Sequence, residues 1–126
     1  MSESIEPDTK DWTWVLTRPC PECGLDAGAL TRADIAPALR ASATALATAL
    51  RLPQAGERPQ PSVWSPLEYG CHVRDVFAIF DYRLGLMLDQ LDPLFPNWDQ
   101  DETAVAERYD QQDPATVSAE LERSAQ

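Results

Sequence analysis

Several features are scarce in this 126-residue sequence, and each scarcity removes a class of function. None of its runs approaches the ~18 consecutive apolar residues of a membrane-spanning helix, and its polar, acidic start does not resemble a signal peptide. The chain has ten Lys and Arg residues against 21 Asp and Glu, which gives a net charge of −11. We therefore expect no nucleic-acid and no membrane partner. Three cysteines without a secretory signal favour a reducing compartment over a disulfide framework. These features predict a cytoplasmic protein.

Histidine is the scarcest residue that could carry chemistry, because His72 is the only one. The sequence also lacks a glycine-rich phosphate loop and a Gly-x-Ser-x-Gly motif, so nothing in it favours phosphoryl transfer or nucleophilic catalysis. A catalytic zinc or nickel site needs about three protein ligands, and one imidazole cannot complete it.

A long central helix is predicted over residues 66–91. Ser65 and Glu68 form a capping box around Pro66, which suits the first helical position, and Pro93 stops the helix. Seven apolar residues recur at steps of three and four and predict one wide apolar stripe. They are Val73, Val76, Phe77, Phe80, Leu84, Met87 and Leu91.

The remaining chain predicts an arm over residues 1–30 and a helical bundle over residues 31–126, within a single domain. Residues 1–10 lack periodicity and are expected to be disordered. Trp12, Trp14 and Leu16 alternate with smaller residues, which indicates a short strand or an extended arm that packs on the body.

Three further helices are predicted, separated by proline-rich loops over residues 52–63 and 92–98. The first begins near Thr31 or Asp34 and buries one face, which comprises Ile35, Leu39, Ala43, Leu46 and Leu50. A short helix follows Asp99 or Asp101 and carries Val105 and Tyr109 inward. The last opens at Asp113-Pro114 and buries Val117 and Leu121.

His72 is the first candidate site residue. It lies on the flank of the apolar stripe, with Glu68 one turn away and Asp75 further round the helix. A histidine at the inner edge of a bundle, whose second nitrogen is held by a carboxylate, suits a metal ligand. The same pattern is also typical of a structural histidine bonded to a carboxylate at the edge of a core.

Cys20 and Cys23 form the second candidate site. The turn Cys-Pro-Glu-Cys-Gly is half of a zinc knuckle, in which both thiolates can face one ion. Only Cys71 and His72 remain as further ligands, and on a helix these two point about 100° apart. A structural turn, a structural metal site and a redox pair therefore remain as alternatives.

The segment WSPLEYGCHVRDV (residues 64–76) resembles the DinB superfamily of DNA-damage-inducible-type and mycothiol-dependent maleylpyruvate-isomerase-like proteins. DWTWVLTRPCPECG (residues 11–24) and PNWDQDETAVAERY (residues 96–109) resemble the actinobacterial branch of that family. The resemblance implies an all-α four-helix bundle with a long proline-rich crossover loop. It also implies a divalent metal, zinc or nickel, held by one histidine on the second helix and two on the fourth.

His72 matches the first of these ligands, and the other two have no counterpart. We therefore expect a bundle that lacks most or all of its fourth helix. The family's chemistry implies a metal-dependent S-transferase or isomerase that uses a low-molecular-weight thiol such as mycothiol, with a small-molecule thiol or substrate as partner.

Two other functions remain open. Without a fourth helix the stripe over residues 73–91 would be exposed, so the chain could be a non-enzymatic binding or dimerisation module, and we expect it to form a homodimer or to be poorly stable. The third hypothesis is a small domain stabilised by zinc at Cys20 and Cys23.

Overall fold

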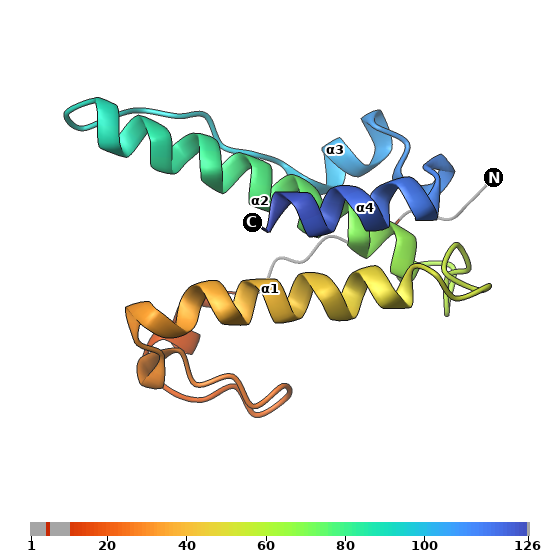
Figure 1. Ribbon diagram of the computed structural model, residues 1–126, viewed down its shortest axis with the longest axis horizontal. Coiled ribbons are helices and arrows are strands. Elements are labelled where there is room, and N and C mark those ends of the chain that lie inside the picture. The colour runs from red at the N-terminus through yellow and green to blue at the C-terminus, as the bar shows by residue number, and fades with distance from the viewer. Residues whose placement is uncertain (1–4, 6–10, 126) are drawn as a thin grey trace.

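The computed structural model describes residue 5 and residues 11–125, and its regular elements are all helical (Figure 1). The prediction of an all-α fold is confirmed for this part of the chain. Three short 3-10 helices and four α-helices follow in order: η1 Thr13–Leu16, η2 Ala27–Ala29, α1 Arg32–Ala49, α2 Pro66–Asp89, α3 Gln100–Ala106, η3 Tyr109–Gln111 and α4 Pro114–Ser124.

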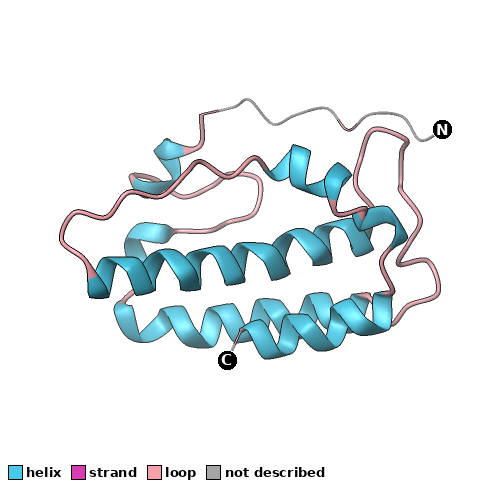
Figure 2. Ribbon diagram, turned by 90° about the horizontal axis from the view of Figure 1, so that it is seen from above, coloured by secondary structure: helices cyan, strands magenta, loops and turns pink. Residues whose placement is uncertain are grey.

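Two long helices, α1 and α2, run in opposite directions and form the frame of the molecule (Figures 1 and 2). They spread apart toward the end where α1 begins and α2 finishes. Helix α4 packs against both of them at the other end. We call this covered end the packed end, and the spread halves, residues 32–42 of α1 and 78–89 of α2, the open end.

The hydrophobic core lies at the packed end. Ser118 on α4 donates a hydrogen bond of 2.9 Å from its buried hydroxyl to the carbonyl of Ala47 and so fixes α4 against α1. Nine buried residues make up the core cluster: Leu50, Ala55, Trp64, Leu67, Cys71, Ala104, Tyr109, Val117 and Leu121.

The helix starts follow the sequence signals. Thr31 with Asp34 and Ser65 with Glu68 form the expected capping boxes of α1 and α2. Asp99 caps α3, and Asp113 caps α4 with Pro114 at its first turn. Each side chain supplies an acceptor for backbone N–H groups that have no partner inside the helix.

The central helix is shorter than predicted. It ends at Asp89, because Gln90 is already extended and Asp92 takes a left-handed conformation with φ of 51°. Asp92 also precedes Pro93, whose ring disfavours a helical conformation in the residue before it. Leu91 is therefore outside the helix and fully exposed.

Several apolar side chains expected to be buried are exposed. Ile35 and Leu39 on α1 and Val105 on α3 all face solvent. The spacing had identified the apolar face of α1 correctly, but only its second half meets α4. On α3 it is Ala104, not Val105, that is buried, and Tyr109 reaches the core from η3 because α3 ends at Ala106.

The first 30 residues also differ from the prediction. Residues 13–16 form the 3-10 helix η1 and neither a strand nor an extended arm, and Trp12 is more than a third exposed. The expected disorder of residues 1–10 falls outside the described residues except at Ile5, which packs against the core cluster. Within the described part of the chain, no helix is both long and apolar enough to cross a membrane.

Candidate functional site

The start of α2 places two neighbouring residues in opposite environments. Cys71 points into the core, where its thiol lies 3.9 Å from the carbonyl oxygen of Tyr109. His72, one position further round the helix, lies half-buried on the flank. The predicted divergence of these two side chains is confirmed, so they do not face one site.

Two tryptophans enclose the imidazole of His72. The ring of Trp98, the last residue of the second proline-rich loop, stacks on it with the ring centroids 5.6 Å apart and an interplanar angle of 5°. The ring centroid of Trp64, just before α2, lies 5.3 Å from that of His72, with the two rings tilted by 46°. The contact with Trp98 joins residues 26 positions apart, and no spacing rule in the sequence indicated it.

The surroundings keep His72 neutral. Burial lowers its pKa below the usual value, and the negative charges of Asp75 and Asp101 oppose that shift without cancelling it. Its Nδ1 atom is buried and has no hydrogen-bond partner among the described residues. A neutral imidazole with such a nitrogen is uncommon in a packed structure, because buried polar atoms are normally paired.

The expectation that a carboxylate holds the second nitrogen of His72 is wrong for Asp75. The Asp75 carboxylate instead accepts a hydrogen bond of 3.0 Å from Arg74 Nε and another from the hydroxyl of Tyr109. Burial and the bond to Asp75 raise the pKa of Tyr109, so its hydroxyl keeps its proton. Asp75 therefore links α2 to η3 and is not the partner of His72.

Arg74 connects this group to α4. Its Nη1 atom donates to Gln112 at 2.7 Å and to the carboxylate of Glu120 at 3.1 Å. The guanidinium thus forms ion pairs with two carboxylates, Asp75 and Glu120, and the Arg74 side chain is only 14% exposed. The positive charge of Arg74 is balanced by these two carboxylates, which disfavours an anionic ligand beside it.

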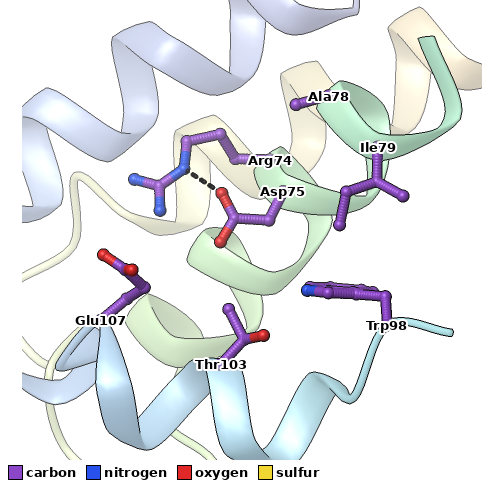
Figure 3. Close-up of a pocket in the computed structure, with 7 residues that line it drawn as sticks. All are labelled: Arg74, Asp75, Ala78, Ile79, Trp98, Thr103 and Glu107. Atoms are coloured by element: carbon purple, nitrogen blue, oxygen red, sulfur yellow. Dashed lines mark hydrogen bonds and ion pairs between the residues drawn. The ribbon is translucent and has the colours of Figure 1, made fainter. Parts of the chain in front are cut away.

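A cavity of about 290 Å³ opens beside this network (Figure 3). The Asp75 carboxylate and the Ile79 side chain lie on the same side of the Trp98 ring. Because Trp98 also stacks on His72, one indole forms part of both the cavity wall and the histidine's surroundings. The lining residues are Arg74, Asp75, Ala78, Ile79, Trp98, Thr103 and Glu107.

A buried ion pair supports the turn into α2. Arg58 binds the carboxylate of Glu68 through two hydrogen bonds of 2.8 and 2.7 Å, and Glu68 also accepts one from the backbone amide of Ser65. Burial alone would raise the pKa of Glu68, but Arg58 and Ser65 outweigh it and leave this pKa below its usual value. The crossover loop is thereby fixed beside Trp64.

The second candidate site is a tight turn on the first 30 residues. Cys20 is buried and Cys23 exposed, and Gly24, with φ of +78°, donates its backbone N–H to the Cys20 carbonyl at 2.8 Å. Hydrogen bonds from the backbone amides of Cys23 and Glu22 lower the pKa of the Cys20 thiol. The two thiols share one turn as expected, far from His72 in sequence and on another element.

The described residues do not assemble a complete metal site. None of their histidine, cysteine, aspartate and glutamate side chains form a group of three or more that could hold an ion. His72 fits the role of one ligand, since it is neutral and has an unpaired nitrogen. Cys20 and Cys23 fit the role of two.

No protein-family model matches the chain, and comparison with curated proteins and with solved structures gives no match.

Proposed function

We propose that this chain carries part of the metal site of a DinB-like, divalent-metal-dependent thiol S-transferase or isomerase, with His72 as one ligand. The observation that supports this most directly is the buried, unpaired Nδ1 of a neutral histidine whose stacking partner, Trp98, lines a cavity. The helical fold and the resemblance of residues 64–76 to the DinB superfamily also favour it.

The roles of the chain's own residues follow from their geometry. Trp98 covers one face of the imidazole by stacking, and Trp64 packs against the ring at a tilt, so the two tryptophans hold the imidazole in one orientation. The adjacent cavity is close to the lower size limit of small-ligand sites and combines an apolar wall with the Asp75 and Thr103 side chains. A bound zinc or nickel ion would supply positive charge that favours a thiolate over a thiol.

Metal content of purified protein tests this proposal. Zinc and nickel are measured by elemental analysis in the wild type, in His72→Gln and in Cys20→Ser/Cys23→Ser, after dialysis against each metal. We expect weak, substoichiometric metal binding, because one imidazole does not complete a site. His72→Gln should abolish it, since glutamine has no imidazole nitrogen, and the double cysteine variant should retain it. Cys71→Ala serves as a control for a cysteine whose side chain points into the core and not toward His72 or the cysteine turn.

Two results would contradict the proposal. Metal that depends on Cys20 and Cys23 but not on His72 would assign the ion to the cysteine turn and favour the zinc-stabilised domain. The absence of any bound metal in the wild type would leave the histidine as a structural residue that stacks on Trp98 and packs against Trp64.

A second candidate function is a non-enzymatic helical binding or dimerisation module. The open end favours it, because five large apolar side chains of α1 and α2 are at least half exposed there. They are Ile35, Phe80, Leu84, Met87 and Leu88. Contiguous apolar surface of this kind marks interaction sites on folded proteins.

A further inference from the structure

The last three turns of α2 present an apolar face that no described element covers. Phe80 is 59% exposed, Leu84 55%, Met87 54% and Leu88 78%. In Figure 1 this part of α2 projects beyond α4, with only the returning loop beside it. That loop contacts the helix through Arg83, which lies over the ring of Phe95, and so runs along a neighbouring side of α2.

The spacing of the face is that of a coiled coil. Val73, Phe77, Phe80, Leu84 and Met87 follow one another at steps of four, three, four and three, and we call them the α2 seam. This is the heptad pattern by which one helix packs its side chains into the holes of another. The first two members pack against the chain's own core, and the last three are exposed.

The exposed area matches what an interface between proteins requires. Together with Leu88 and Leu91 and with Ile35 and Leu39 on α1, the exposed seam residues present apolar surface on the order of 800 Å². That is about the area that each partner contributes to a stable complex. A single bound peptide or small ligand would cover only part of it.

We propose that a second copy of this chain covers this face, with the two α2 helices packed antiparallel along their exposed seams. A seam without charged residues is self-complementary, as a two-fold interface requires. Each chain carries a net charge of −11, and an antiparallel arrangement directs the two packed ends away from each other. A parallel arrangement would bring these acidic bodies side by side.

The inference gives the second candidate function a partner and an orientation, and it does not depend on the metal proposal. His72 lies on the flank of α2, about 120° from Leu84 at 100° per residue. The metal content of a monomeric variant would therefore still test the role of His72, and oligomeric state would still test the interface in metal-free protein.

The oligomeric state is measured by sedimentation equilibrium and light scattering over a range of concentrations, with Leu84→Glu as the test variant. Leu52→Glu is the matched control, because Leu52 is similarly exposed (60%) but lies in the crossover loop. We expect a wild-type and control dimer that Leu84→Glu weakens at least tenfold in Kd. The wild-type dimer should also tighten from about 0.05 to about 0.5 M NaCl, since salt screens repulsion between the acidic chains.

Orientation is measured by cross-linking in a Cys20→Ser/Cys23→Ser background. In an antiparallel coiled coil Leu84 meets Phe80 or Met87 of the partner, whereas in a parallel one it meets Leu84. We therefore expect disulfides when Leu84→Cys chains are mixed with Met87→Cys or Phe80→Cys chains, and few in Leu84→Cys alone. Efficient linkage of Leu84→Cys alone would overturn the antiparallel arrangement. A monomer at every concentration, or a dimer that Leu84→Glu leaves intact, would overturn the interface.

Discussion

The packed end and the open end use the same two helices but differ in what covers them. At the packed end, Leu121 and Val117 of α4 are fully buried against α1 and α2. At the open end, Leu84 and Leu88 of α2 are also leucines on a regular helix, but both remain more than half exposed. Helix formation is thus alike at both ends, whereas the burial that stabilises the fold is concentrated at one.

This difference also places the candidate sites. His72 and the cavity lie where α2 leaves the packed end, so a rigid core supports them from one side. The α2 seam begins in that same core at Val73 and Phe77 and continues into solvent. One helix therefore carries both a supported site and an uncovered interface.

Truncating one leucine at each end should show the largest difference. Leu121→Ala removes a fully buried side chain and leaves a cavity, and we expect it to lower the free energy of unfolding by about 2–5 kcal/mol. Leu88→Ala, at a position 78% exposed, should change it by less than about 0.5 kcal/mol in the monomer. Urea unfolding at low protein concentration measures both. Equal losses would show that the open end is packed in solution.

Breaking one ion pair in each environment should give the next largest difference. Arg58→Ala leaves the buried Glu68 carboxylate without its main partner, at a cost of about 2–3 kcal/mol in the free energy of unfolding. Arg51→Ala breaks the exposed pair with Glu122 and should cost about 0–1 kcal/mol. Thermal unfolding followed by circular dichroism compares the two. A loss for Arg51→Ala as large as that for Arg58→Ala would contradict this ranking.

Two glycines on α2 allow a finer comparison. A Cβ at Gly70 would lie 2.7 Å from Cδ1 of the buried Leu50, so Gly70→Ala should destabilise the chain by about 1–3 kcal/mol. Gly85 has nothing within 4 Å of that position, and Gly85→Ala should stabilise the helix by about 0.5–1 kcal/mol. Opposite signs in the two unfolding free energies are the expected result. Destabilisation by Gly85→Ala would place another chain or segment against the open end.

Local signals in the sequence predicted the fold better than its packing. The caps at Thr31, Ser65, Asp99 and Asp113 each began a helix because an N-cap depends on residues within one turn. Burial depends on what lies opposite, and the same apolar spacing gave a buried Ala43 and an exposed Leu39 on α1. Only the position of α4, set by long-range contacts, separates these two outcomes.

The candidate site was predicted in part. Helical geometry placed His72 on the flank of α2 and separated it from Cys71, and both predictions are confirmed. The stacking of Trp98 and the bond between Tyr109 and Asp75 join segments more than 20 residues apart. No local period encodes such contacts. Asp75 was close enough in sequence to suggest a hydrogen bond with His72, but its carboxylate accepts hydrogen bonds from Tyr109 and Arg74 instead.

Lowering the pH below about 4.5 should weaken the packed end gradually, and we expect this to be the smallest of the effects. The pKa of Glu68 in the folded chain lies below its unfolded value of about 4.5, so the unfolded chain binds more protons as the pH falls through this range. The stability that Glu68 contributes is therefore complete above pH 4.5 and is lost progressively below it. Arg58→Ala removes the main group that lowers this pKa and should flatten the decline. Urea unfolding at several pH values from neutral to about pH 3 measures how the unfolding free energy of the wild type and of Arg58→Ala depends on pH. An equally steep decline in the variant would assign the acid sensitivity to carboxylates other than Glu68.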